Sequence, residues 1–536
     1  MSTSVKSRKM ASTANPLNRA DTGNFELSGR TIALLLAGFA TVTAYWMIQS
    51  PRPYDDDNIG RYFMAQAAMT KPEYFLNIWG RPLAIIFFLL PSQLGYWYCA
   101  AATALLSVGT CYFTYRAAQA SGKSNAWLAL IFVAFQPMFF ITGYSLCTEP
   151  LAAFFLAVGL YYYYKKNWVV SALLLSLMPL GRTELVLILP IFAIAFFREK
   201  QYWPILLMGT GLALYQIAGM IATGDILYLL TVSKSGFGHG LYQNGPFEHY
   251  FQRFIFIVGP VLFVFILLQL IHDIQRRDVN VINISCLLIF GIHVYFYWKG
   301  NVASIGFLRH FVGIAPILAL WALDGANTWF NDRVNRQTSL ITLMAIAVLT
   351  LIYYSFDLIG DYFLSQQKDY LKFSIVLLLA LLFVLQHYLN FTGRFFRKLM
   401  LISAAAGTVV YTFIKEPPLQ LAPEHQTVKN FQKYFEENLK TQSPRTMIAH
   451  PWFFFFDDFN YYAKEYADGN YLEMRKEKMS ELPVGGLVVW DTHYSWRLSS
   501  NVQQDDLTKN PDYKFIQQFV STDRKFAIYV FEKIKG

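Results

Sequence analysis

Long apolar segments recur along most of the sequence, and they restrict the chain to folds that can be built inside a lipid bilayer. Of its 536 residues, 55% are hydrophobic and 15% are charged, whereas a soluble domain carries about 25% charged residues. A helix of about 20 apolar residues crosses a bilayer, so the sequence predicts an all-α polytopic membrane domain. Thirteen spans are predicted, over residues 29–48, 94–116, 124–141, 147–164, 168–181, 184–197, 203–222, 251–272, 280–298, 307–323, 338–355, 371–388 and 399–414.

Lysine and arginine residues gather in alternate connections between these spans. They lie in the N-terminal tail and near residues 116–123, 165–166, 198–200, 276–277, 333–336 and 394–398. Cations of this kind mark cytoplasmic loops, so we expect the N-terminus inside and, with an odd number of spans, the C-terminus outside. The same bias accounts for the net charge of +10, which therefore does not indicate a nucleic-acid partner.

Three regions follow from this organisation: a cytoplasmic tail (1–28), a membrane domain (29–414) and an outer domain (415–536). In the outer domain, apolar residues at helical spacing in 428–439 predict a helix. Residues 446–449, 487–490 and 526–531 have the composition of strands, so we expect a small α/β domain. The four cysteines lie in or beside apolar segments, and their spacing matches no zinc site.

Three consecutive carboxylates follow the first predicted span, in Tyr54-Asp55-Asp56-Asp57-Asn58-Ile59-Gly60-Arg61. Helical spacing of apolar residues in 59–67 predicts a short amphipathic helix on the bilayer surface. The apolar stretch 83–90 is too short to span and predicts a second surface or re-entrant helix. One acid can cap the first helix, but a cap does not explain three. Adjacent carboxylates repel one another and are typical of a general base, a metal ligand or a partner for a cation.

An acidic pair in the first outer loop, two juxtamembrane helices, about thirteen spans and an outer C-terminal domain together resemble the GT-C membrane glycosyltransferases. This superfamily includes protein mannosyltransferases, lipid A aminoarabinose transferases and bacterial arabinosyl- and mannosyltransferases. Tyr54-Asp55-Asp56 followed by Ile59 is similar to its pattern of an aromatic residue, two acids, two further residues and isoleucine. The resemblance implies that Asp55 is the catalytic base and Asp56 its partner, and it leaves Asp57 as the helix cap. It also implies a sugar donor linked to polyprenyl phosphate.

Acids that begin later apolar segments are further candidates. Glu149, in Ser145-Leu-Cys-Thr-Glu-Pro150, either compensates a helix dipole or faces the catalytic cavity, where GT-C enzymes similarly place an acid that orients the acceptor or a metal. Arg182 and Glu184 either form an ion pair that holds a hairpin or line the cavity, with Arg182 near the donor phosphate. A divalent metal held by Asp56 and Glu149 is compatible with this set but is not required.

A cationic pair, Arg309-His310, opens the predicted span 307–323. Helix dipoles disfavour cations at this end, so the pair indicates a nearby anion, and the planar guanidinium suits phosphate. A similar pair in GT-C proteins is associated with the lipid-linked phosphate, and Lys299 is a candidate to assist it. Snorkelling to the membrane interface is the alternative for Arg309 and Lys299.

Two polar stretches remain. The glycine-rich loop 234–249 carries His239, Glu248 and His249, and it is either a mobile cover over the substrate or a plain connection. Residues 490–497 of the outer domain combine aromatic rings with an aspartate, a histidine and an arginine, which either bind sugars or pack on the membrane domain.

The resulting hypothesis is a transferase in a bacterial inner (plasma) membrane, with its C-terminus in the periplasm. It transfers mannose or another hexose or pentose, with inversion, from a polyprenyl-phosphate donor to an acceptor hydroxyl of a glycan, lipid or protein. The alternative is a transporter or flippase for a lipid-linked or anionic solute, whose intramembrane charges line a pathway. Transporters commonly show matched halves with broken helices, and no such symmetry is evident in the sequence.

Overall fold

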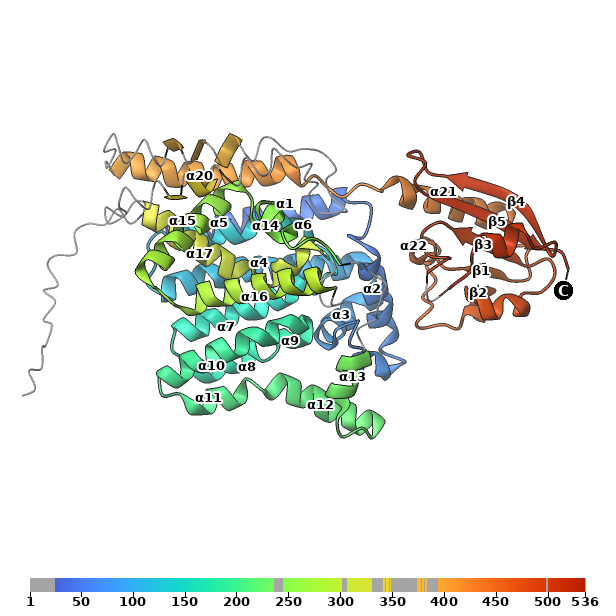
Figure 1. Cartoon of the computed structure of the whole chain (residues 1–536), viewed down its shortest axis with the longest axis horizontal. Coiled ribbons are helices and arrows are strands. Elements are labelled where there is room, and N and C mark those ends of the chain that lie inside the picture. The colour runs from blue at the N-terminus through green and yellow to red at the C-terminus, as the bar shows by residue number, and fades with distance from the viewer. Residues whose placement is uncertain are drawn as a thin grey trace, which may run out of the picture.

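The chain forms a helical bundle with a small sheet region beyond one end (Figure 1). The structure, a computed structural model, describes residues 25–235, 244–300, 306–329, 394–497 and 500–535, with short pieces between 341 and 382. The bundle contains α1 (Gly29–Gln49), α2 (Asp56–Ala67), η2 (Pro72–Leu76), α3 (Pro82–Leu94), α4 (Tyr96–Ala120), α5 (Trp127–Ala134), α6 (Pro137–Thr142), α7 (Glu149–Tyr164), α8 (Trp168–Leu175), α9 (Met178–Gly181), η3 (Thr183–Ile188), α10 (Leu189–Arg198), α11 (Tyr202–Leu207), α12 (Thr210–Thr223), α13 (Tyr228–Ser235), α14 (His249–Val258), α15 (Pro260–Arg276), α16 (Val281–Lys299), η4 (Leu308–Ile314), α17 (Ala315–Trp329) and α20 (Arg394–Lys415).

Several apolar helices of the bundle are long enough to cross a membrane. By length and composition these are Gly29–Gln49, Tyr202–Thr223, Val281–Lys299, Leu308–Trp329 and Phe395–Lys415 among the described residues, and α14 with α15 adds a sixth if that bent pair is one span. The predicted spans 338–355 and 371–388 lie largely outside the described residues.

Proline and glycine interrupt several segments that the hydropathy pattern joins into single spans. The predicted span 251–272 bends by 119° where α14 gives way to α15 at Gly259-Pro260. Predicted span 124–141 is divided between α5 and α6 before Pro137, and 168–181 between α8 and α9 before Pro179. Proline lacks the N–H that a helix interior needs, so these breaks reflect local backbone chemistry that apolar composition does not reveal.

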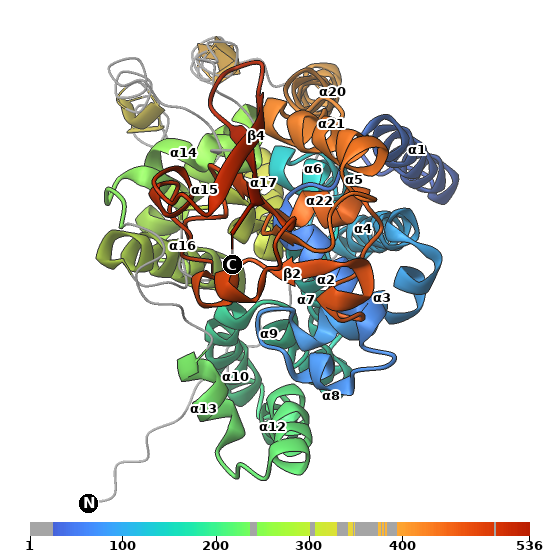
Figure 2. The ribbon, with the colours of Figure 1, turned by 90° about the vertical axis from the view of Figure 1, so that its right-hand side faces the viewer.

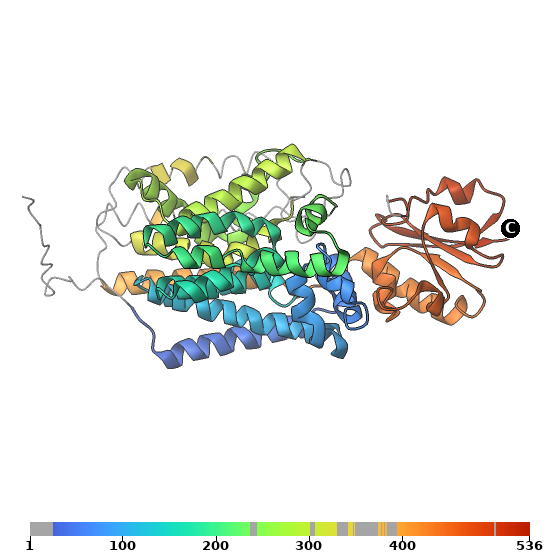
Figure 3. The same ribbon diagram turned by 90° about the horizontal axis from the view of Figure 1, so that it is seen from below.

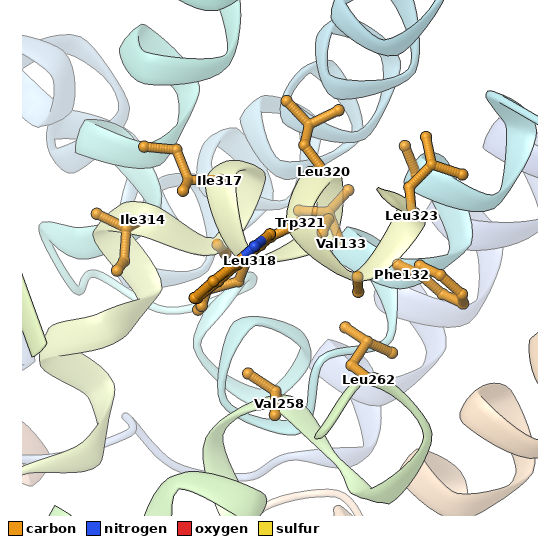
Figure 4. Close-up of a cluster of buried hydrophobic side chains, with 14 of the residues drawn as sticks. Phe132, Val133, Val258, Leu262, Ile314, Ile317, Leu318, Leu320, Trp321 and Leu323 are labelled. Atoms are coloured by element: carbon orange, nitrogen blue, oxygen red, sulfur yellow. The ribbon is translucent and has the colours of Figure 1, made fainter. Parts of the chain in front are cut away.

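The bundle core is built from large apolar side chains of helices that are distant in sequence. Figure 4 shows Phe132 and Val133 of α5, Val258 of α14, Leu262 of α15 and a row from η4 and α17 in one cluster. The row comprises Ile314, Ile317, Leu318, Leu320, Trp321 and Leu323, all almost fully buried. Because η4 and α17 are buried along most of their length, Arg309 in η4 is also buried within the bundle.

Close packing of α17 on α15 depends on Gly325. A Cβ there would lie 2.0 Å from the carbonyl oxygen of Phe265. Gly325→Ala is therefore expected to lower the free energy of unfolding by about 1–3 kcal/mol through overpacking, measured as a lower Tm in detergent. Gly38→Ala on α1 is the control, since a Cβ at Gly38 meets nothing within 4 Å. Equal melting temperatures for the two variants would contradict this packing.

The C-terminal region is a small mixed sheet with helices. Its elements are α21 (Pro423–Asn438), β1 (Thr446–Ile448), α22 (Pro451–Phe456), η5 (Tyr466–Gly469), β2 (Tyr471–Glu473), η6 (Lys476–Glu481), β3 (Leu487–Asp491), α23 (Asp505–Thr508), β4 (Tyr513–Val520) and β5 (Ala527–Lys533). The strand order is β2-β1-β3-β5-β4, with β1 parallel to both neighbours and β5 antiparallel to both of its own. The predicted helix and three predicted strands are confirmed as α21, β1, β3 and β5. β2 and β4 were not predicted.

The segment between α1 and α4, which the sequence predicts to be the first outer loop, lies between the bundle and the C-terminal region. In Figure 2 the C-terminal region faces the viewer, and α22 packs on α2. Figure 3 shows the long helices running along one axis, with the sheet region beyond their end. Nine of the twelve residues of α2 are buried, so the expectation of a surface helix on the bilayer is wrong. Asn460 donates to the carbonyl oxygen of Phe63 at 2.9 Å, one of the contacts that cover this helix.

Candidate functional site

The three acids of the first outer loop begin α2. Asp55 has an extended backbone, with φ −154°, and its side chain accepts a hydrogen bond from the backbone N–H of Asn58 at 3.1 Å. Asp55 is therefore the N-cap, and the assignment of Asp57 as the cap is wrong. The sequence permits either choice because both acids precede apolar residues at helical spacing. All three carboxylates lie at the positive end of the helix dipole, which favours their charge.

Asp55 and Asp57 share one partner, whereas Asp56, between them, points elsewhere. Asp55 accepts a hydrogen bond from Arg309 Nη1. Asp57 lies 2.7 Å from Arg309 Nη2 and 3.5 Å from Arg61 Nη2. Asp56 points to the C-terminal region, where its carboxylate accepts a hydrogen bond from the indole Nε1 of Trp452. Asp55 and Asp57 thus belong to an arginine cluster, whereas Asp56 belongs to the interface with the C-terminal region.

Arg309 is the centre of the arginine cluster. It lies in η4, is 4% exposed, and has its guanidinium carbon 4.4 Å from the ring centroid of Phe307. Besides Asp55 and Asp57 it approaches Glu149, with 3.6 Å between Nε and Oε1. One guanidinium therefore joins the first outer loop, the start of α7 and the start of the α17 segment. Its rigid fork of donors allows this, and a lysine has no equivalent.

Glu149 connects Arg309 to a second arginine. Its Oε1 lies 2.9 Å from Arg182 Nη1, and Arg182 Nη2 lies 2.6 Å from Glu184 Oε1. Arg182 and Glu184 thus form a mutual ion pair and also belong to the arginine cluster. Glu149 is 1% exposed, and its Oε2 has no hydrogen-bond partner in the described part of the chain. Unsatisfied oxygens of this kind are rare in folded proteins and indicate a place where a substrate group can donate.

Two histidines extend the cluster. His293 Nε2 lies 4.0 Å from Glu184 Oε1, and the rings of His293 and His310 are 5.3 Å apart between centroids. His310 is buried directly beside Arg309. His293 was not predicted, because a histidine within the apolar segment 280–298 has no local motif to mark it.

The remaining predicted site residues lie apart from these contacts. His249 Nε2 donates to the carbonyl oxygen of Gly306 at 2.8 Å, which ties α14 to the segment before Arg309. Glu248 is exposed, and Lys299 is exposed with its Nζ 3.8 Å from the ring centroid of Trp298. His239 lies outside the described residues.

The cluster also contains arginines that sequence reasoning missed. Arg61 lies with its guanidinium carbon 5.6 Å from the Trp79 ring centroid and pairs with Asp57. Arg81 donates to Thr183 Oγ1 at 3.4 Å and has φ +65°, a left-handed conformation that is uncommon outside glycine. Each stands in the charged segment between α1 and α4, where a single arginine is not a distinctive signal.

Burial and the neighbouring charges separate the acids electrostatically. Burial raises the pKa of Asp55 to about 6, although Arg309 opposes the shift. Burial would also raise the pKa of Asp57, but Arg61 and Arg309 bring it below its ordinary value. The pKa of Asp56 is raised by burial, against the opposing effects of His450 and the Trp452 hydrogen bond. Of the two aspartates that pair with Arg309, Asp55 is therefore the one whose pKa is raised towards neutrality.

The arrangement does not favour a metal ion between Asp56 and Glu149. Arg182 and Arg309 both lie within 4 Å of the same oxygen of Glu149, and two guanidinium groups repel a divalent cation strongly at such distances. Asp56 meanwhile bonds to Trp452 on the other side of α2. Metal binding by this pair stays a prediction.

A hydrogen bond across the interface gives a further prediction. Trp452→Phe keeps an aromatic ring but removes the donor to Asp56, and it is expected to lower the free energy of unfolding by about 1–2 kcal/mol. The measurement is the Tm in detergent. Trp496→Phe is the control, since Trp496 is 51% exposed and its Nε1 bonds the carbonyl oxygen of Thr492. Equal destabilisation of both variants would show that the bond to Asp56 contributes nothing.

The fold, a helical membrane domain with several apolar spans, a helical loop after α1 and a small mixed sheet region at the C-terminus, is similar to that of ArnT. Two crystal structures of ArnT from Cupriavidus metallidurans match it over 94% of this chain and 98% of theirs, each at 10% sequence identity. The TM-score is 0.55 for apo ArnT and 0.54 for ArnT bound to undecaprenyl phosphate. No protein-family model and no curated protein sequence matches the chain. The resemblance inferred from the sequence is confirmed at the level of the fold.

Proposed function

We propose that the protein transfers a sugar from a polyprenyl-phosphate donor to an acceptor hydroxyl at the outer face of the membrane, with inversion at the anomeric carbon. The observation that carries this proposal is the position of Arg309. Its guanidinium has a geometry that suits phosphate, and it contacts the carboxylate of Asp55 directly. A base for the acceptor and a counter-charge for a leaving phosphate are thereby placed side by side. The ArnT fold supports it, since one ArnT structure contains undecaprenyl phosphate.

In this reaction Asp55 accepts the proton of the acceptor hydroxyl as that oxygen forms a bond to the anomeric carbon. The bond from the anomeric carbon to the phosphate oxygen breaks, and polyprenyl phosphate leaves with the electron pair. Arg309, assisted by Arg182 and His310, stabilises the negative charge that develops on the phosphate. Phosphate needs no proton to leave, so one carboxylate is a sufficient acid–base group, and no step requires a metal.

The neighbouring acids have supporting roles in the proposal. Asp57 and Glu149 hold the Arg309 guanidinium from two sides, which fixes the fork before substrate arrives. Glu149 Oε2, which has no partner among the residues that the structure describes, accepts a hydrogen bond from an acceptor hydroxyl, and Glu184 orients Arg182. Asp56 acts from the interface with the C-terminal region. Lys299 and the loop residues His239, Glu248 and His249 remain candidates for contacts with substrate farther from the reacting atoms.

The same proposal places the protein in a bacterial inner membrane with the N-terminus cytoplasmic and the C-terminal region periplasmic. The alternating cations in the sequence support this orientation. The sugar is mannose or another hexose or pentose, and the acceptor is a glycan, a lipid or a protein.

The test is purified protein in proteoliposomes that contain polyprenyl-phosphate sugars and an extract of envelope glycans as acceptors. Transfer of labelled sugar, with release of polyprenyl phosphate in equal amount and an inverted anomeric linkage in the product, is the expected result. Movement of the lipid-linked substrate across the bilayer without transfer would overturn the proposal in favour of a flippase.

The pH dependence of transfer follows from the pKa of Asp55, which burial raises to about 6. A base must be ionised to accept a proton, and a protonated carboxyl predominates below this pKa. Transfer at subsaturating substrate is therefore expected to fall roughly tenfold per pH unit below about pH 6 and to level off above about pH 7. Initial rates between pH 4.5 and about 8 measure this, and a profile that is flat across about pH 5–7 would contradict the assignment.

A further inference from the structure

A second group of titratable side chains lies in the C-terminal region, on the side that contacts α2. Glu424 comes from the first turn of α21, His450 from the N-cap of α22, and His493 from the loop after β3. Glu424 Oε1 lies 3.1 Å from His450 Nε2 and also contacts His493 Nδ1. One oxygen and two imidazole nitrogens from three separate elements thus converge, all within 4.8 Å of one another.

Several acids lie near this group. His450 experiences the negative charges of Glu424, Asp491 and Asp56 together, and Asp491 is 1% exposed. In the described part of the chain, none of these three acids forms an ion pair with a lysine or arginine. Buried charge is retained in proteins where it is paired or coordinates a metal, so the balancing positive charge comes either from protonated histidines or from a bound metal ion.

We propose that Glu424, His450 and His493 bind a divalent transition-metal ion of the zinc type. Two imidazole nitrogens and one carboxylate oxygen are the donor set that zinc and its neighbours prefer, and hard cations such as Mg²⁺ favour all-oxygen sets. Zinc ligands lie about 2.0–2.2 Å from the ion, so small movements bring the three atoms into a coordination sphere. Three protein ligands leave a remaining position for water. The proposal does not depend on sugar transfer.

The site is linked to the interface through His450. Its Nδ1 accepts a hydrogen bond from the backbone N–H of Trp452 at 3.3 Å, which places the proton of the neutral ring on Nε2. Coordination through Nε2 moves that proton to Nδ1 and ends this bond at the N-terminus of α22. The bond is long, and a metal–imidazole bond outweighs it. Trp452 of the same helix donates to Asp56, so the metal would be bound next to the helix that contacts the three acids.

The sequence predicts that residues 490–497 either bind sugars or pack on the membrane domain. Two of them, Asp491 and His493, lie at the Glu424 group instead. Asp491 accepts hydrogen bonds from the backbone N–H groups of His493 and Tyr494 at 2.8 and 2.6 Å. It therefore fixes the turn that presents His493 to Glu424, which is the supporting role that residues around a metal ligand commonly have.

The experiment uses the full-length protein in detergent, purified without a histidine tag, stripped with a chelator and incubated with ZnCl₂. After gel filtration, elemental analysis is expected to find about one zinc per chain in the parent, and Co²⁺ in place of Zn²⁺ is expected to give visible d–d absorption. Glu424→Gln and His493→Gln are each expected to lose that equivalent. Glu437→Gln is the matched control, an exposed glutamate on the same helix, and it is expected to bind like the parent.

Equal zinc content in the parent and both ligand variants would overturn the proposal. A Tm that responds to pH but not to Zn²⁺ or Co²⁺, with no metal retained, would also overturn it and assign the group to proton binding. His493 is 30% exposed at its side chain, so His493→Gln is expected to fold even if Glu424→Gln does not. None of these readouts involves sugar transfer, so the outcome is separate from that of the proposed function.

Discussion

Asp55→Asn is expected to reduce sugar transfer by about 10²- to 10⁴-fold, the usual contribution of a general base. The amide cannot accept the proton of the acceptor hydroxyl. The variant is nevertheless expected to fold, because asparagine is as good an N-cap as aspartate and its side-chain oxygen can still accept from Asn58 and Arg309. A large loss of rate with a small change in Tm is therefore the expected combination. Initial rates in proteoliposomes and the Tm of the same preparation measure it.

Asp56→Asn and Asp57→Asn are the matched comparisons, because each makes the same chemical change one or two residues away. Asp56 accepts a hydrogen bond from Trp452, which an amide oxygen also accepts, so its variant is expected to keep transfer within about tenfold of the parent. Asp57 pairs with Arg309 and Arg61, and its variant is expected to raise KM more than it lowers kcat. If Asp56→Asn abolished transfer while Asp55→Asn remained active, the base would be Asp56.

Much of the candidate site can be predicted from the sequence because charge is expensive inside an apolar chain. Glu149, Arg182 and Arg309 each interrupt or open an apolar segment, and the structure brings all three together with Asp55. Burying any one of these charges alone is costly, so each needs the others as partners. Their spacing along the sequence does not predict the contacts, but apolar segments contain few charges and therefore few possible partners.

The division of work among the three acids could not be predicted in the same way. A shift of one residue turns a helical side chain by about 100°, and the sequence does not fix where the first helical turn begins. Trp452 lies 396 residues after Asp56, in a region for which the sequence predicts only a small α/β domain and no contact with the acids. The covering of α2 by this region, and therefore its burial, follows from packing between distant segments.

The fold shows a similar division. The spacing of apolar residues in α21 and the composition of β1, β3 and β5 reveal these elements. β2 has only three residues, and β4 has a mainly half-exposed or exposed pattern with a register irregularity between Phe515 and Gln517. Such strands depend on neighbours already in the sheet. Apolar composition likewise marks membrane segments but does not reveal where Gly259-Pro260 bends one of them.

Arg309→Gln is expected to destabilise the whole protein as well as to abolish transfer. The arginine is the shared partner of Asp55 and Asp57 and approaches Glu149, and its removal leaves these carboxylates facing one another. Breaking a buried ion pair by removing one partner costs about 3–5 kcal/mol. The Asp55 and Glu149 side chains are 12% and 1% exposed, so water compensates little. The expected result is a lower Tm in detergent and an increased yield of aggregated protein.

Lys299→Gln is the matched control for stability, because it also removes one cation before the α17 segment but from an exposed side chain over Trp298. Exposed charges contribute about 0–1 kcal/mol, so its Tm is expected to equal that of the parent. Arg309→Lys separates charge from geometry: it keeps one positive charge but cannot form the fork. It is expected to recover part of the Tm without recovering transfer. If Arg309→Gln and Lys299→Gln melted at the same temperature, the arginine cluster would not hold the loop after α1 to the bundle. The contact between Arg309 and Asp55 would then no longer support the proposed function.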